Sequence, residues 1–153
     1  QQGFNQQILG AVASDDSQCP VGGGEAFDGY ILTGFGGADV LSGDAAARAE
    51  EFAAFFNVVY PDAADFNGFT LAGADSYNVM VQAVNNAGSA DPDAVLDALQ
   101  NLEGYPGVSG DITYAGTDGT PADRTIAFFQ YAVPGADGSE WTKGSLFGIG
   151  TGQ

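Results

Sequence analysis

Carboxylates are the only abundant side chains in this sequence that could do chemistry. The chain has 20 Asp and Glu against 3 Lys and Arg, and it has no His. Glycosidase-type hydrolysis would need two carboxylates set apart as acid and nucleophile. No spacing sets any pair of the glutamates apart: Glu25, Glu50, Glu51, Glu103 and Glu140. Acyl transfer lacks a base and an activated nucleophile, because there is no His and no Gly-x-Ser-x-Gly elbow. We therefore expect no enzyme.

The sequence also predicts no metal site and no cofactor. Asp118 and Asp123 lie near a turn, but their spacing is not that of the 12-residue EF-hand loop, which favours a solvated turn. Cys19 is the only cysteine, so it cannot form an internal disulfide, and it has no second Cys or His with which to anchor zinc. We interpret Cys19 as a buried or loop residue; the alternative is a bridge to a segment absent from this chain.

The charge balance excludes several classes of partner. A net charge of −17 repels phosphate backbones and anionic lipid headgroups, so we expect no nucleic-acid partner. No apolar run approaches the length of a membrane span, so the chain is not expected to cross a bilayer. One hypothesis is an extracellular protein of a high-salt environment, where salt screens the repulsion between carboxylates. The alternative is an acidic secreted protein of an ordinary habitat.

Apolar periodicity predicts two helices in series. The apolar positions of the first recur at steps of three to five residues: Phe69, Ala72, Tyr77, Met80, Val84 and Ala87. These positions are expected to form its buried face, with Tyr77 in the core, and Gly88 should end the helix in a left-handed cap. Asp91 should cap the second helix and Pro92 should occupy its first position. Its expected buried side chains are Val95, Leu96 and Leu99.

Other segments read as a third helix and several strands. Residues 44–59 predict a helix that Pro61 ends, with Asp44 paired to Arg48 one turn later. Phe52, Phe55 and Phe56 on this helix would form an exposed apolar patch. Strands are predicted at residues 8–12 and 29–35, and a hairpin should join residues 111–115 to residues 125–133 across a turn at residues 117–120.

Several of these stretches resemble a known family. GFNQQILG, FDGYILTGF and FTLAGADSYNVMVQAVNNAGSADPDAVLDALQNLEGYPGVSGDITYAGTDG resemble, in this order, the solute-binding proteins of ABC importers of the branched-chain amino-acid type. The resemblance covers essentially the whole chain. It implies the C-terminal half of a type I periplasmic-binding fold: a partial, two-lobed α/β structure made mainly of lobe-one helices and hinge-crossing strands.

The resemblance also implies a division of the chain. Residues 1–35 would be the end of lobe two and the first hinge strand, and residues 36–109 the lobe-one helices. Residues 110–133 would be a returning hairpin, followed by a C-terminal tail at residues 134–153. The function implied is capture of a small solute in an interlobe cleft, outside the cell or in the periplasm, and delivery to a membrane permease.

Four residues are expected at the cleft by this resemblance: Phe69, Val12, Ala13 and Phe35. Amino-acid-binding members often place an acid two residues after the glycine that matches Gly10, where it holds the ligand's ammonium group. This chain has Val12 there, which offers no charge, so an amino-acid ligand is in doubt. Asp15 or Asp16 could replace that acid from the following loop, although acids in such loops are more often solvated. Phe69 is expected at the cleft wall, with helix packing as the alternative.

The chain starts at Gln1 without Met, and we expect a mature or trimmed product that lacks the family's opening half. The helices between residues 44 and 100 would then need a partner to cover their apolar faces. That partner would be the missing N-terminal half of the parent or further copies of the chain. The alternative function is a structural extracellular protein that forms a homopolymer or filament through these faces.

Overall fold

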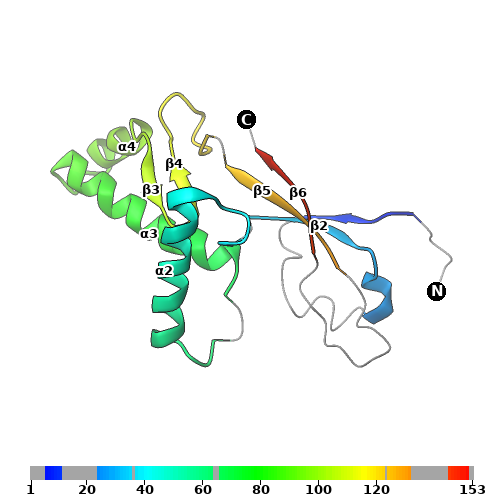
Figure 1. Cartoon of the computed structure of the whole chain (residues 1–153). Coiled ribbons are helices and arrows are strands. Elements are labelled where there is room, and N and C mark those ends of the chain that lie inside the picture. The colour runs from blue at the N-terminus through cyan, green and yellow to red at the C-terminus, as the bar shows by residue number, and fades with distance from the viewer. Residues whose placement is uncertain are drawn as a thin grey trace. The chain divides into compact units, whose positions relative to one another are not determined.

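The computed structural model describes residues 6–11, 24–35, 37–63, 66–122, 124–131 and 145–151 (Figure 1). The fold is mixed α/β, as predicted, and it divides into two compact units. The first unit comprises Gln1–Gly34 and Ile126–Gly150, and the second comprises Phe35–Thr125 and Thr151–Gln153. The chain therefore passes from the first unit to the second after Gly34 and returns after Thr125.

The first unit is built on a four-stranded sheet in the order β1-β2-β5-β6. Its strands are β1 (Leu9–Gly10), β2 (Ile31–Gly34), β5 (Thr125–Gln130) and β6 (Ser145–Thr151). β1 runs parallel to β2, whereas β5 pairs with β2 in the antiparallel direction, with Leu32 opposite Phe129. The strands predicted within residues 8–12 and 29–35 are thus present in shorter form.

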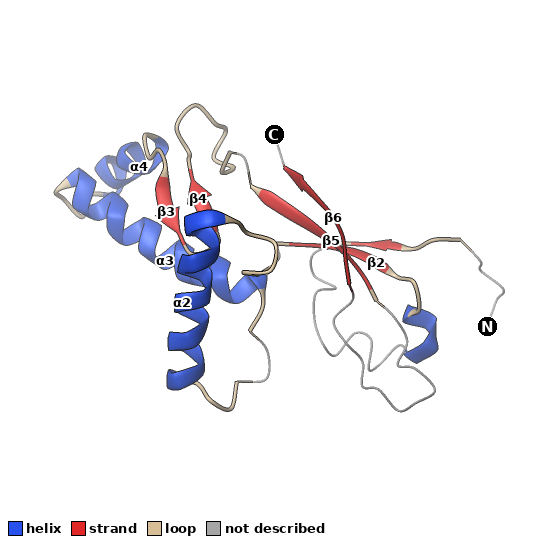
Figure 2. Ribbon diagram, viewed as in Figure 1, coloured by secondary structure: helices blue, strands red, loops and turns tan. Residues whose placement is uncertain are grey.

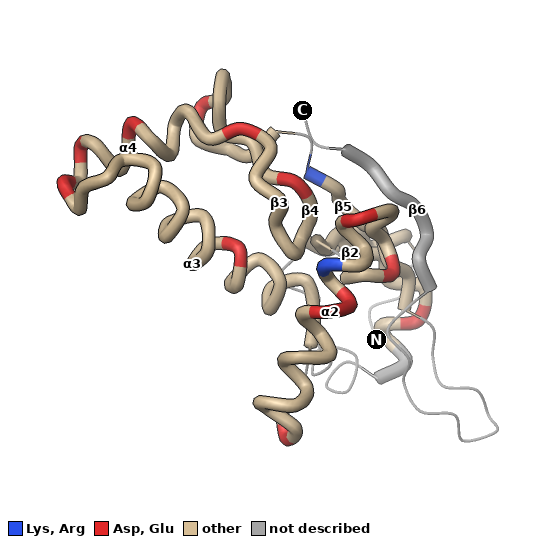
Figure 3. Tube along the Cα trace, turned by 60° about the vertical axis from the view of Figure 1, so that its left-hand side comes forward, with Lys and Arg blue, Asp and Glu red and all other residues tan. Residues whose placement is uncertain are grey.

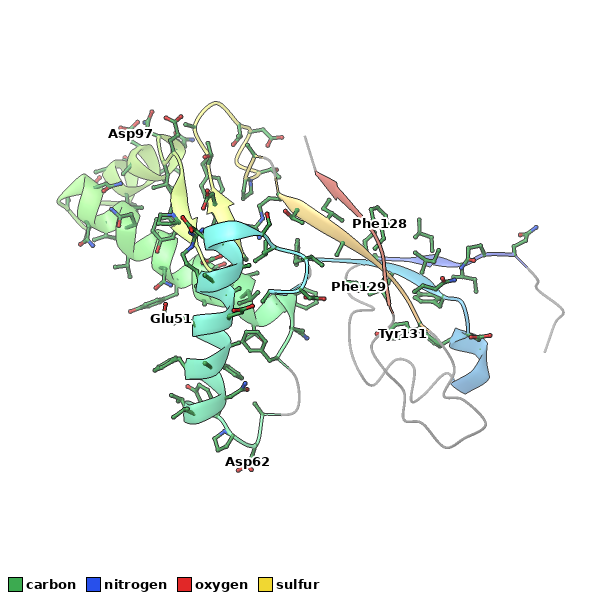
Figure 4. The ribbon with its side chains drawn as sticks, in the orientation of Figure 1. Glu51, Asp62, Asp97, Phe128, Phe129 and Tyr131 are labelled. Atoms are coloured by element: carbon green, nitrogen blue, oxygen red, sulfur yellow. The ribbon has the colours of Figure 1, made fainter. Side chains whose placement is uncertain are left out.

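Alternation along the strands forms the core of the first unit. Leu32 and Phe129 are fully buried, and Phe128 and Phe129 lie on opposite faces of β5 (Figure 4). The short 3-10 helix η2 (Gly24–Phe27) brings Phe27 against Tyr30, with ring centroids 4.7 Å apart. A Cβ at Gly10 would lie 1.8 Å from the Tyr30 hydroxyl oxygen, so a larger residue there would require the Tyr30 side chain to move.

Helices dominate the second unit (Figure 2). They are α2 (Gly43–Val59), α3 (Gly68–Ala87) and α4 (Pro92–Gln100), with a two-stranded antiparallel sheet of β3 (Tyr105–Gly107) and β4 (Gly110–Ile112). The predicted helix stop is confirmed, since Gly88 has φ 60°. The predicted cap is confirmed as well, because the Asp91 side chain accepts from the amides of Asp93 and Ala94.

The predicted buried face of α3 was wrong. The side that packs inward carries Leu71, Asp75, Val79 and Ala83, and Val79 joins a core cluster with Leu102 and Ile112. Tyr77, expected in the core, is 72% exposed, and Met80 is 49% exposed. The reason is that Asp75 bonds the turn between β3 and β4, which directs the adjoining face of the helix inward.

Two packing predictions for the other helices hold only in part. On α2, Phe55 is exposed, but Phe52 and Phe56 are half-buried and pack against Phe66 with ring centroids 6.1 and 5.4 Å away. On α4, Val95 and Leu99 are partly buried whereas Leu96 is 52% exposed.

The predicted hairpin between residues 111–115 and residues 125–133 does not form. β4 pairs with β3, and β5 pairs with β2 in the other sheet. The connection between β3 and β4 is only Val108 and Ser109, so this local pairing closes a much shorter loop than a pairing of β4 with β5 would. Among the described helices, none is both long and apolar enough to cross a membrane.

Candidate ligand-binding surface

Two of the four predicted site residues meet in the second unit. The rings of Phe35 and Phe69 stand edge to face, with centroids 5.8 Å apart and an interplanar angle of 89°. Phe35 is half-buried and Phe69 is 43% exposed, so part of the aromatic surface of the pair is exposed. Edge-to-face pairs of this kind are stabilising and hold both rings in defined orientations.

The start of α3 fixes the position of Phe69. Asn67 is the N-cap, and its side-chain oxygen accepts from the amides of Phe69 and Thr70 at 3.0 and 3.3 Å. The Thr70 hydroxyl in turn accepts from the Asn67 amide, which completes a capping box. Asn67 thus satisfies two of the orphan amide donors at the start of α3 and fixes the backbone that carries Phe69.

Val12 and Ala13 lie outside the described residues, as do Asp15, Asp16, Cys19 and Asp123. The described strands still bear on this region. β1 and β2 are parallel, and Gly10 lies opposite Leu32, so the carboxyl ends of the two strands lie at the same end of the sheet. Ala11 follows β1 there, and Phe35 follows β2.

Sequence reasoning missed a polar cluster around the turn between β3 and β4. Asp75 on α3 is 3% exposed, and its carboxylate accepts from the amides of Val108 at 2.7 Å and Ser109 at 2.8 Å and from the Ser109 hydroxyl. Gly107 lies so close that a Cβ there would be 2.7 Å from an Asp75 oxygen. The available signal was that Asp75 is the only charged residue in the sequence of α3.

The two arginines of the described part bind the hairpin formed by β3 and β4. Arg48 donates to the Gly107 carbonyl at 3.0 Å and to the Asp111 carboxylate at 2.6 Å. The predicted pairing of Arg48 with Asp44 is therefore wrong, because the side chain reaches across to β3 and β4 instead. Arg124 donates to the Ser109 hydroxyl oxygen at 2.9 Å. Because Arg124 lies next to Thr125, where the chain leaves the unit, this cluster anchors that crossing segment.

The acidic side chains do not form a metal-binding group among the residues that the structure describes. Asp118 is fully exposed, and a hydrogen bond from the Thr120 backbone amide, with a second from the Thr120 side chain, lowers the pKa of its carboxyl. This describes an ordinary solvated turn.

Comparison with known proteins gives a consistent result. A family model described as "Periplasmic binding protein" matches residues 1–139. A leucine binding protein from Thermotoga maritima is 20% identical with a TM-score of 0.72, and the match covers 94% of this chain and 38% of that one. No curated protein matches the sequence significantly.

Two further solved structures share the fold. A leucine-, isoleucine-, valine-, threonine- and alanine-binding protein from Brucella ovis, in a closed conformation, is 16% identical with a TM-score of 0.68, covering 97% of this chain and 37% of that one. An ABC-transporter solute binding protein from R. palustris in complex with benzoate is 15% identical with a TM-score of 0.57, covering 84% and 32%. The chain therefore spans about a third of the length of these structures.

Proposed function

The chain belongs to the periplasmic binding protein family, and from this premise we propose that it is the ligand-binding component, or part of one, of an ABC-type uptake system. The fold is a partial type I periplasmic-binding fold, and family members bind solutes rather than catalyse reactions. The proposed location is periplasmic or extracellular, and the proposed partner is a membrane permease that accepts the solute. The proposed binding place is a cleft between the two lobes that closes on the solute.

The solute that we propose is small and has an apolar or aromatic end. The contact between Phe35 and Phe69 supports this most directly, because an exposed edge-to-face pair can stack on or enclose such a group. Leucine and benzoate, named for two of the similar structures, both have such an end. Val12 and Ala13 are proposed to line the same site, and neither side chain can pair with an ammonium group.

Calorimetric titration of the protein purified from its own cells, with leucine and with benzoate, tests this proposal. We expect binding of at least one of them, with Phe69→Ala weakening it by about tenfold, or about 1.4 kcal/mol. Phe55→Ala is the matched control, because it removes an exposed phenylalanine from α2. Tighter binding of benzoate than of leucine would support a site without an ammonium partner. Equal effects of the two substitutions would contradict the role of Phe69.

A further inference from the structure

The sequence contains a single Asn-Gly pair, Asn67–Gly68, at the start of α3. Asparagine is a chemically labile residue, because the backbone nitrogen of the next residue can attack its side-chain carbonyl carbon. Glycine lacks the Cβ that would hinder this approach. Every other asparagine precedes a residue that has a Cβ: Asn5, Asn57, Asn78, Asn85, Asn86 and Asn101. The sequence therefore singles out Asn67.

The structure leaves Asn67 partly accessible to water and holds it in a defined conformation. Its side chain is half-buried, and its backbone is extended, with φ −142° and ψ −175°. Its side-chain oxygen accepts from the amides of Phe69 and Thr70. Gly68 is the first residue of the helix, so its amide has no acceptor inside the helix. The nitrogen that would attack is therefore not engaged in helix hydrogen bonding.

We propose that Asn67 is a site of spontaneous deamidation, which turns the neutral cap of α3 into a carboxylate. The Gly68 nitrogen bonds to the side-chain carbonyl carbon of Asn67. The bond from that carbon to the side-chain nitrogen breaks, and ammonia leaves with the proton of the Gly68 amide. Water then opens the cyclic imide. Cleavage at the former side-chain carbonyl gives aspartate, and cleavage at the backbone carbonyl gives isoaspartate, so water is the only co-reactant.

The capping box controls the rate of this reaction. Closure of the imide ring requires the backbone and side chain of Asn67 to rotate out of the capping conformation, which breaks the hydrogen bonds from Phe69 and Thr70. The reaction therefore proceeds when the first turn of α3 opens, and helix ends open more readily than helix interiors. We expect Asn67 to lose its amide several-fold more slowly in the folded protein than in urea.

The two products have different effects on α3. Aspartate caps a helix as well as asparagine does, and its negative charge is favourable at a helix N-terminus. Isoaspartate adds a carbon to the backbone, so the capping box cannot re-form. Either product places a carboxylate near Phe69, at the start of a helix whose only charged residue is the buried Asp75. Figure 3 shows this helix almost free of charge. The modification itself does not depend on the proposed function.

Peptide mass spectrometry tests the proposal on protein purified from its own cells and incubated at neutral pH, folded and in urea. We expect the Asn67 amide to be lost about tenfold faster than the amides of Asn57 and Asn78, because each of these precedes a β-branched valine. Both product isomers should be found at Asn67. Loss at Asn67 that is no faster than at Asn57 and Asn78 would overturn the proposal.

Two variants test the roles of the glycine and of the cap separately. Gly68→Ala should slow the loss at Asn67 by about tenfold in urea, where the folding of the variant plays no part. Thr70→Val keeps the amide donor but removes the hydroxyl that completes the capping box. It should therefore speed the loss in the folded protein and leave the rate in urea unchanged. An unaltered rate in urea for Gly68→Ala would contradict attack by this nitrogen, and an unaltered folded rate for Thr70→Val would contradict control by the cap.

Discussion

Asp75 determines how the second unit is packed. Its buried carboxylate accepts from two backbone amides and one hydroxyl of the turn between β3 and β4. Hydrogen bonds to an ionised acceptor are stronger than neutral ones, and removing the acceptor leaves the buried amide donors unsatisfied. The single charge in α3 therefore fixes both the rotation of the helix and the position of the turn.

The first prediction follows from this carboxylate. Asp75→Ala should lower the free energy of unfolding by about 2–4 kcal/mol, because the buried amide of Ser109 loses its acceptor. Urea denaturation followed by circular dichroism measures the change. Asp97→Ala is the control, because Asp97 is exposed on α4 (Figure 4); it should change stability by less than about 0.5 kcal/mol. Similar losses in both variants would contradict the role of Asp75.

The second prediction compares two glycines of the second unit. Gly107→Ala would place a Cβ 2.7 Å from both an Asp75 oxygen and the Gly110 carbonyl oxygen, so it should destabilise the protein by about 1–3 kcal/mol. Gly73→Ala meets nothing within 4 Å and lies inside a helix. In the 153-residue chain, Gly73→Ala should raise the free energy of unfolding by about 0.5–1 kcal/mol. The thermal midpoints of the two variants should therefore move in opposite directions, and a shift in the same direction would refute this explanation.

The third prediction concerns pH and Asp118. Because the Thr120 backbone and then its side chain lower the pKa of Asp118, the folded-state pKa lies below the unfolded one. The contribution to stability is therefore present above the unfolded pKa and lost as pH falls through the folded pKa. Carboxyl carbon shifts in NMR should report this lowered pKa. Thr120→Ala, which removes only the side-chain hydrogen bond, should raise it part of the way; a pKa equal to that of the denatured chain would contradict it.

At the scale of elements, the sequence predicted which helices exist and where they end better than it predicted how they pack. The caps at Gly88 and Asp91 follow from local chemistry, and both are present. The buried face of α3 could not be chosen by periodicity, because apolar residues occur on most sides of the helix. Its orientation depends on Asp75 meeting a turn more than thirty residues away, as the 33-residue separation from Val108 shows. The predicted pairing of β4 with β5 failed for a related reason, because no strand was predicted at residues 105–107, which pair with β4.

The fourth prediction concerns the link between α2 and the β3–β4 pair. Asp111 is 71% exposed in its side chain, so its ion pair with Arg48 should contribute no more than about 1 kcal/mol. The bond from Arg48 to the Gly107 carbonyl is partly buried and should add about another 1 kcal/mol. Arg48→Ala should therefore destabilise more than Asp111→Ala, and a double-mutant cycle with urea denaturation measures the coupling. A larger effect of Asp111→Ala would contradict this partition.

At the scale of the whole molecule, the family and the partial fold were predicted and are confirmed by the family match and the solved structures. The proximity of Phe35 and Phe69 could be anticipated only through the family resemblance, because 34 positions of sequence separate them. The roles of Phe35, Phe69, Val12 and Ala13 in solute binding stay predictions. The amino-acid composition adds one feature that the fold does not require, namely the excess of Asp and Glu over Lys and Arg.

The fifth prediction concerns that excess. Both arginines of the described part are engaged at the hairpin formed by β3 and β4, which leaves most carboxylates without a cationic neighbour in a chain of net charge −17. The screening length falls from about 10 Å at 0.1 M salt to about 3 Å at 1 M, so added salt should relieve their mutual repulsion. If the chain is adapted to high salt, its thermal midpoint should rise by roughly 10 °C between low and molar sodium chloride, which corresponds to a few kcal/mol for a domain of this size.

Neutralising exposed acids separates this explanation from a general effect of salt on burial. Glu51→Gln, Asp97→Asn and Glu103→Gln together remove three exposed carboxylates from three different parts of the second unit. Because they reduce repulsion directly, they should raise the midpoint at low salt and flatten its rise with sodium chloride. Differential scanning calorimetry of both proteins across the salt series measures this. A slope that is the same with and without the three substitutions would assign the salt effect to apolar burial, and a midpoint that does not depend on salt would favour an acidic protein of an ordinary habitat.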